Sequence, residues 1–154
     1  TTVYRQVQFA EFEKFIHDKI TAGETLQAEV LEQYWLDSNR TYYGPALTVD
    51  SGLKSEWSRI PHFHTPFYVY KYATGYSAAT AFSESILKEY AENKKAESGP
   101  NSATAKYLAF LHSGGSDYSL NLLKDAGVDL NTPMPVRVTL EKFRRKLNEL
   151  KALL

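Results

Sequence analysis

Cysteine is absent from the 154 residues of this sequence. A disulfide framework, a thiolate metal site and a cysteine nucleophile are therefore excluded. The absence fits a reducing compartment. Turn-forming residues are also scarce, since eight Gly and six Pro fall below the share of roughly 12% that is usual in globular proteins. Few turns for this length favour long helices over many short strands.

The sequence carries no excess of either charge and no long apolar run. Lys and Arg together number 18, as do Asp and Glu, so the net charge is 0. This balance argues against a basic nucleic-acid-binding protein. The longest uninterrupted apolar run is Tyr107–Leu111, whereas a membrane-spanning helix needs roughly 20 apolar residues. We therefore expect neither nucleic acid nor a membrane as a partner.

The length and the overall composition are those of one globular domain, and we expect residues 1–154 to form a single helical domain. Hydrophobic residues make up 43% and charged residues 23%, which is typical of such chains. The chain starts at Thr1 without an initiator Met or a signal pattern. This start predicts a processed chain or a piece of a longer protein.

Apolar residues at steps of three and four predict the helices of the first third of the chain. Such a stripe predicts a helix over residues 3–21, with Gly23 as its stop. Thr25 is expected to cap a second helix that ends near Asn39. Residues 42–61 are the longest stretch without periodicity, and long loops inside compact domains are often functional.

Thr65 and Pro66 predict the start of a long helix that runs to about Tyr90. Its middle, residues 73–81, consists mostly of small residues. We therefore expect this helix to be the most enclosed one, with a close helix crossing at Gly75 that offsets the low helix propensity of glycine.

Three further helices are expected in the last third of the chain: residues 103–112, a helix capped by Ser116 and stopped by Gly127, and a last helix from Val136 onwards. The last helix has a narrow apolar stripe for packing on one neighbour. It is also rich in Lys and Arg, which we assign to a solvated outer face rather than to a site for an anionic partner. The fold class is therefore mostly α.

Chemistry is best placed in residues 61–72, which carry two histidines among many aromatics. His62 and His64 could both reach one metal if this segment is extended, although such spacing is common by chance. Hydrogen-bond donation by His and Tyr toward a developing oxyanion is the better interpretation. On a helix, Tyr68 and Tyr72 share a face while Tyr70 lies about 200° from Tyr68. Core packing is the simpler explanation of such a Tyr stripe.

No complete catalytic motif is present. The nucleotide-binding glycine loops, the serine nucleophile elbow and the H-E-x-x-H zinc motif are all missing. Glu11 and Glu13 are assigned to a charged face of the first helix. The residues alone thus indicate a helical domain with an aromatic, histidine-bearing segment.

Several strings, in order along nearly the whole chain, resemble the late part of the catalytic domain of oligoendopeptidase F. They are RQVQFAEFE (5–13), YYGP (42–45), RIPHF (59–63), FYVYKYATGYSAA (67–79), SGGSDY (113–118) and LLKDAGVD (122–129). This family comprises largely helical zinc metallopeptidases, related to thimet oligopeptidase, that cleave short peptides inside a deep channel. The resemblance implies a multi-helix, C-terminal part of such a catalytic domain.

The same resemblance implies that zinc binds elsewhere in the parent protein. The family's H-E-x-x-H helix and its third ligand, a Glu, lie upstream of the segment that Thr1 begins. We therefore expect zinc in the full-length enzyme, no metal bound by this chain's own residues, and no activity of this chain alone. The expected partners are an oligopeptide substrate and the missing N-terminal part of the catalytic domain, with a homo-oligomer as a further possibility. The expected location is the cytoplasm.

The resemblance implies that this chain forms the side of the active site that lies opposite the zinc. In the family, a His and Tyr residues of this region contact substrate and stabilise the oxyanion. His62 matches the family's His, and Tyr70 is assigned as the oxyanion donor, with Tyr68 as its competitor. Tyr68 and His64 are assigned to substrate binding, although His64 departs from the family's string. The alternative function is a non-enzymatic helical module that binds a partner peptide through the aromatic segment.

Overall fold

The computed structural model describes residues 1–93 and 99–154, and helices are the only regular elements in these ranges. This confirms the mostly α class. The elements are α1 (Tyr4–Thr21), α2 (Ala28–Tyr43), the 3₁₀-helices η1 (Ser51–Arg59) and η2 (Pro61–His64), α3 (Tyr70–Asn93), α4 (Ala103–Ser113), α5 (Ser119–Asp125) and α6 (Met134–Lys151). In the described ranges, no helix is both long and apolar enough to cross a bilayer.

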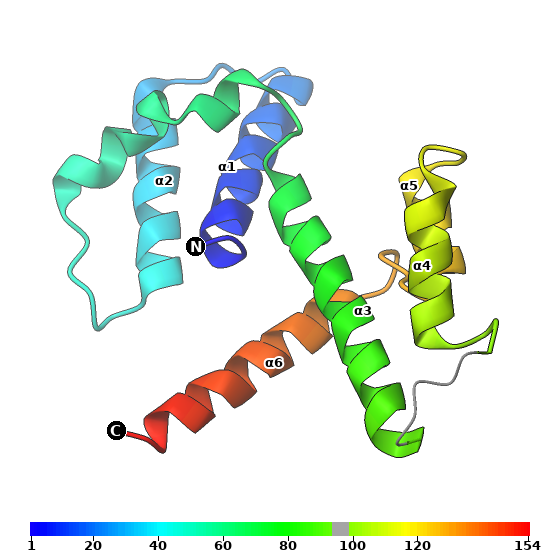
Figure 1. Ribbon diagram of the computed structural model, residues 1–154. Helices are drawn as coiled ribbons and strands as arrows, with labels where there is room; N and C mark the ends of the chain where they lie inside the picture. Colours follow the sequence, from blue (N-terminus) through cyan, green and yellow to red (C-terminus); the bar gives the residue numbers. More distant parts are fainter. Residues whose placement is uncertain (94–98) are drawn as a thin grey trace. The chain divides into compact units, whose positions relative to one another are not determined.

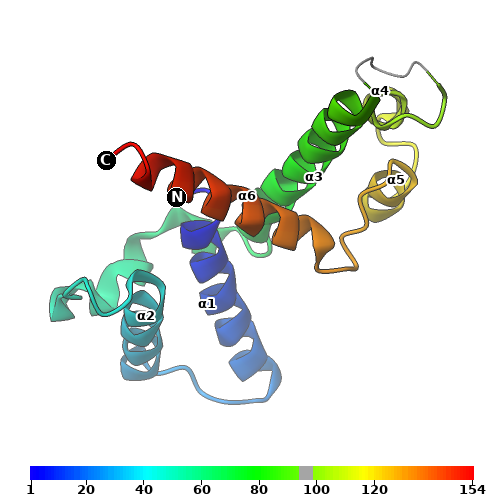
Figure 2. The ribbon, with the colours of Figure 1, turned by 90° about the horizontal axis from the view of Figure 1, so that it is seen from below.

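The chain divides into two compact units, Thr1–Ala73 and Thr74–Leu154. In the first unit, α1 and α2 form an antiparallel pair (Figure 1), and they lie side by side in the second view as well (Figure 2). Their apolar stripes meet in one core, in which Phe12 and Trp35 are fully buried with ring centroids 5.0 Å apart. The core also contains Phe9, Leu31, Ile60 and Val69.

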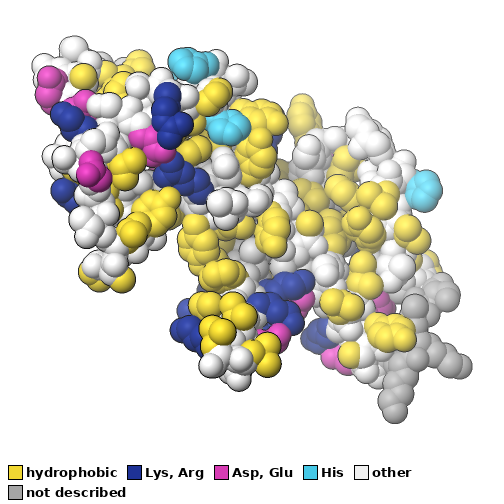
Figure 3. Space-filling model, turned by 60° about the vertical axis from the view of Figure 1, so that its left-hand side comes forward, with side chains coloured by type: hydrophobic (Ala, Val, Ile, Leu, Met, Phe, Trp, Pro, Cys, Tyr) yellow, Lys and Arg dark blue, Asp and Glu magenta, His cyan; other side chains and the backbone are white. Residues whose placement is uncertain are grey.

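The second unit has its own smaller core beneath α3. Phe82 is buried there with Ala78 and Val128, and its ring lies 5.1 Å from Tyr107 and 5.4 Å from Phe110 of α4. The α6 helix is joined to α3 by ion pairs at Glu84. Many large apolar side chains of this unit remain exposed, and hydrophobic side chains are prominent on the surface shown in Figure 3.

Several predicted helix ends are confirmed. The first helix ends at Thr21, and Gly23 takes the left-handed conformation expected of a stop, with φ 76°. The α4 helix begins after Ser102, whose hydroxyl accepts a hydrogen bond of 3.0 Å from the Ala105 N–H. Gly127 likewise has a positive φ of 96° after α5.

Other predicted starts are wrong. The α2 helix begins at Ala28, with Gln27 rather than Thr25 at the N-cap, and Tyr118 rather than Ser116 precedes α5. The α6 helix begins at Met134, ahead of the predicted Val136, because prolines fit the first turn of a helix.

The long third helix also begins later than predicted, at Tyr70 instead of Thr65 and Pro66. Residues Pro61–His64 form η2 instead, and Phe67 has a left-handed backbone with φ 56°, which interrupts any helix. In the described part of the chain, a Cβ at Gly75 would meet nothing within 4 Å, so the close helix crossing expected there is not found among these residues.

Candidate functional site

The segment that carries the histidines is fixed to the first unit by buried apolar side chains. Ile60 and Val69, at its two ends, are 6% and 0% exposed. Between them, the ring of Phe63 lies 5.6 Å from Phe9 and 5.1 Å from Phe12 of α1. Because Phe63 points into the core, its neighbour His62 is held at the edge of that core.

Two tyrosine rings lie next to the half-buried ring of His62. Its centroid lies 6.1 Å from the ring of Tyr68 in a stacked arrangement and 5.5 Å from that of Tyr72 in an edge-on one. The rings of Tyr68 and Tyr72 are themselves 5.8 Å apart. We call these three residues the His62 cluster. The turn at Phe67 brings Tyr68 to Tyr72 although Tyr68 precedes the helix.

The hydrogen bonding within this cluster favours the protonated phenol of Tyr72. A hydrogen bond with the Tyr68 side chain, and then desolvation, raise the pKa of Tyr72 above its ordinary value. Both tyrosines remain partly exposed, Tyr68 at 42% and Tyr72 at 38%. The Lys71 ammonium lies 5.4 Å from the centre of the Tyr68 ring. The cluster therefore presents imidazole and phenol hydrogen-bonding groups on an accessible surface.

The other two predicted site residues, Tyr70 and His64, are not members of this cluster. Tyr70 is the first residue of α3 and is 46% exposed, and the helical period places it about 200° from Tyr72. His64 is exposed at the end of η2. The sequence did not single out Tyr72 as a candidate, although its position in the predicted Tyr stripe was a signal that it lies near Tyr68.

No three-ligand metal group is present in the described part of the chain. Within residues 1–93 and 99–154, no set of three or more His, Asp or Glu residues could hold a metal ion. In the same ranges, His62 and His64 belong to no group of three such side chains.

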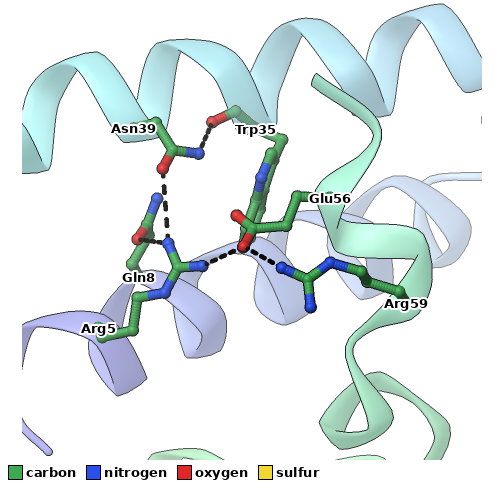
Figure 4. Close-up of polar contacts among 6 residues, drawn as sticks. All are labelled: Arg5, Gln8, Trp35, Asn39, Glu56 and Arg59. Atoms are coloured by element: carbon green, nitrogen blue, oxygen red, sulfur yellow. Dashed lines mark hydrogen bonds and ion pairs between the residues drawn. The ribbon is translucent and has the colours of Figure 1, made fainter. Parts of the chain in front are cut away.

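An ion-pair cluster connects α1 to the 3₁₀-helix just before η2 (Figure 4). The Arg5 guanidinium lies 2.8 Å from the Glu56 carboxylate, which also accepts a hydrogen bond of 2.9 Å from Arg59. Arg5 also donates to Gln8 at 3.1 Å and to Asn39 of α2 at 3.5 Å. We call these five residues the Arg5 cluster.

The Arg5 cluster determines where η1 lies against the helix pair. The Arg5 side chain is only 21% exposed and that of Glu56 only 11%, and the guanidinium stacks 4.8 Å from the centre of the Phe9 ring. Because η2 follows η1 after one residue, this cluster also helps to fix the position of His62.

The surroundings of Glu13 differ from those predicted. It was expected on a charged helical face together with Glu11, but it is only 5% exposed, while Glu11 is exposed as predicted. Its carboxylate accepts a hydrogen bond of 2.7 Å from the backbone N–H of Phe67. Its helical spacing from Phe9 was a signal that it shares the buried face.

This helical arrangement belongs to a known class of proteins. The model of Peptidase family M3 matches residues 1–141, and the chain therefore belongs to this family.

Individual relatives resemble nearly the whole chain. It is 44% identical over 153 residues to Oligopeptidase PepF of Bacillus subtilis (strain 168), covering 99% of this chain and 21% of that protein. It is 39% identical over 152 residues to the plasmid-encoded Oligoendopeptidase F of Lactococcus lactis subsp. cremoris, covering 99% of this chain and 24% of the relative.

A solved structure confirms the resemblance of the fold. The crystal structure of oligoendopeptidase-F from Enterococcus faecium superposes with a TM-score of 0.88 at 41% identity, covering 99% of this chain and 27% of that chain. The helical fold is therefore that of a fragment of an oligoendopeptidase structure. The chain spans about a quarter of the length of these relatives.

Proposed function

We propose that this chain is the C-terminal part of the catalytic domain of a zinc endopeptidase that hydrolyses peptide bonds in short oligopeptides. Support comes from membership of Peptidase family M3 and from the identity of 44% to an oligopeptidase along 99% of the chain. In this proposal, residues 1–154 belong to one domain together with the part that precedes them. The complete protein acts in the cytoplasm.

Zinc, in this proposal, is bound by residues outside this chain. The described residues offer no group of three His, Asp or Glu for it. The metal's contribution when bound is that of a Lewis acid. The contribution of this chain is the set of hydrogen-bonding side chains on the opposite wall of the substrate site.

The His62 cluster is the observation that carries this assignment. It gathers one imidazole and two phenols within 6.1 Å between ring centroids, on a surface that a peptide can reach. Hydrogen-bond donors fixed before the reaction stabilise an oxyanion better than mobile ones. From this cluster we assign His62 to the oxyanion and Tyr68 to peptide binding, and the geometry adds Tyr72 to the candidates. The assignments of Tyr70 to the oxyanion and of His64 to peptide binding rest on the family resemblance, because both residues are outside the cluster.

The proposal is tested on the full-length protein with quenched fluorescent peptides of increasing length. We expect cleavage of short peptides, loss of cleavage after treatment with a chelator, and its return on addition of zinc. The 154-residue chain alone is expected to cleave nothing under the same conditions. A zinc-loaded full-length protein that binds peptides without cleaving them would instead support a non-enzymatic binding module.

A further inference from the structure

Glu13 is a carboxylate in surroundings that are costly for a charge. It is 5% exposed and lies next to Phe12, which is fully buried in the core of the first unit. A buried carboxylate is stable only when hydrogen bonds replace its lost water. The Glu13 carboxylate accepts a hydrogen bond from the backbone N–H of Phe67, which is 54 residues away along the chain.

Phe67 has an unfavourable backbone conformation that other contacts must stabilise. Its φ of 56° makes it the one non-glycine residue with positive φ in the described ranges. This conformation is unfavourable for a bulky side chain. Its ring is 57% exposed and packs at 4.5 Å on His17 of α1. The carboxylate bond to the Phe67 N–H, which is charge-assisted and short at 2.7 Å, therefore stabilises a strained turn.

The turn at Phe67 determines the direction of Tyr68. On one side, Phe63 anchors η2 in the core, and on the other side Val69 is fully buried. Tyr68 lies between the turn and Val69, and its ring meets His62 and Tyr72. A different backbone conformation at Phe67 would point Tyr68 away from His62.

We propose that Glu13 is a positioning residue of the peptidase site: it holds the Phe67 turn and thereby keeps Tyr68 against His62 and Tyr72. This proposal rests on the function proposed above. Glu13 touches neither the substrate nor the reacting atoms, and it acts through the backbone of Phe67. Its loss should therefore lower kcat more than it raises KM, because the donors that it aligns act on the transition state.

The test combines backbone hydrogen exchange, followed by mass spectrometry, with kinetics on the full-length protein. In Glu13→Ala we expect the Phe67 amide to exchange about tenfold faster or more and kcat to fall by about 10- to 100-fold, with unchanged zinc content. Glu13→Gln keeps an oxygen acceptor of the same shape and should fall between wild type and Glu13→Ala in both measurements. Glu11→Gln is the matched control, because Glu11 is exposed and accepts a hydrogen bond from Tyr42 instead.

A double variant distinguishes a positioning role of Glu13 from a general loss of the fold. Glycine adopts the left-handed conformation without strain, so Phe67→Gly should need less help from Glu13. The double variant Glu13→Ala, Phe67→Gly is expected to recover kcat relative to Glu13→Ala, which a general loss of packing would not allow.

The outcomes distinguish the two levels of the proposal. Unchanged exchange of the Phe67 amide in both Glu13 variants would overturn the contact, and faster exchange with unchanged kcat would overturn the positioning role. A wild-type protein that cleaves no peptide would overturn the proposed peptidase function, while the exchange experiment would still decide whether Glu13 holds Phe67.

Discussion

At the scale of single residues, Tyr70 and Tyr72 have different surroundings although they are only two positions apart. Tyr72 belongs to the His62 cluster, and its pKa is raised by its hydrogen bond with Tyr68. Tyr70 lies about 200° away around α3 and is 46% exposed. A single oxyanion is therefore not equally accessible to both phenols, and the two can be separated by substitution.

Tyr70→Phe in the full-length protein is expected to lower kcat by about 100-fold, because removal of one oxyanion donor typically has at least this effect. Zinc content should stay unchanged, since Tyr70 is not assigned to the metal. Tyr118→Phe is the matched control because this tyrosine is 83% exposed. Peptide hydrolysis and metal analysis give both readouts.

Tyr72→Phe decides between the candidates in the same assay. Normal turnover in Tyr70→Phe would remove Tyr70 from the mechanism. If Tyr72→Phe then shows the large loss of turnover, the donor role moves to Tyr72 and to the His62 cluster.

At the scale of elements, two ion-pair groups join helices that are distant in the sequence. Arg5 and Glu56 connect α1 to η1, and Glu84 connects α3 to Lys142 and Arg145 of α6. The second group shows that part of the basic face of α6 pairs with α3 within the second unit. Both groups can be tested with matched substitutions.

In the Arg5 cluster, two arginines that differ in burial pair with the same carboxylate, that of Glu56. The side chain of Arg5 is 21% exposed and that of Arg59 is 75% exposed. Arg5→Met should lower the free energy of unfolding by about 1.5–3 kcal/mol, because it removes hydrogen bonds to a mostly buried charge. Arg59→Met should lower it by less than about 1 kcal/mol, as is usual for an exposed pair.

Urea unfolding followed by tryptophan fluorescence measures this difference. Both tryptophans of the chain, Trp35 and Trp57, lie in the first unit and therefore report on it. Equal losses of stability for Arg5→Met and Arg59→Met would contradict the role given to Arg5.

Through Glu84, the stability of the folded state should depend on pH. Hydrogen bonds from Lys142, and next from Arg145, lower the pKa of Glu84 below its ordinary value of 4.5. A carboxyl group with a lowered pKa stabilises the folded state above that ordinary value. This contribution is lost as the pH falls through the lowered pKa. Glu84→Gln should therefore melt at a lower temperature than wild type at pH 7, and the difference should shrink as the pH falls below 4.5.

Thermal melts of both proteins between pH 3 and pH 7 provide the measurement. Lys88→Gln serves as the control, because its ion pair with Glu92 spans 3.9 Å and is highly exposed. A difference between wild type and Glu84→Gln that stays constant down to pH 3 would contradict the linkage.

The sequence predicted the helices better than their junctions. Periodic apolar residues and glycine stops are local signals, so the existence of each α-helix in residues 1–93 and 99–154 could be predicted. The start of α3 could not, because it depends on the left-handed backbone of Phe67, which is held by Glu13 from another helix. His62 could be named as a candidate from the sequence, whereas its contact with Tyr72 depends on the path of the chain around Phe67.

At the scale of the whole molecule, apolar side chains remain on the surface. The α6 stripe is the clearest example, with Leu140 and Leu147 each 37% exposed and Leu150 54% exposed. Contiguous exposed apolar surface of this kind marks an interface or favours association. In relatives about four times as long, other parts of the protein are available to cover such a stripe.

The isolated 154-residue chain is therefore expected to self-associate as its concentration rises. Leu150→Lys should weaken this association, because it places a charge on the exposed stripe. Asn148→Lys is the matched control, since it adds the same charge to an exposed position of α6 outside the stripe. Sedimentation velocity gives the answer, and a wild-type chain that stays monomeric at every concentration would contradict the expectation.

The division of the chain at Ala73 has a practical consequence for protein engineering. His62, Tyr68 and Tyr72, together with Arg5 and Glu13, all belong to the unit Thr1–Ala73. Because the boundary at Ala73 falls inside α3 (Tyr70–Asn93), we expect an exchange of this stretch between family members to keep these contacts only if the helix stays continuous across the junction. If the proposed peptidase function holds, such chimeras would reveal which share of the peptide preference is inherited with these 73 residues.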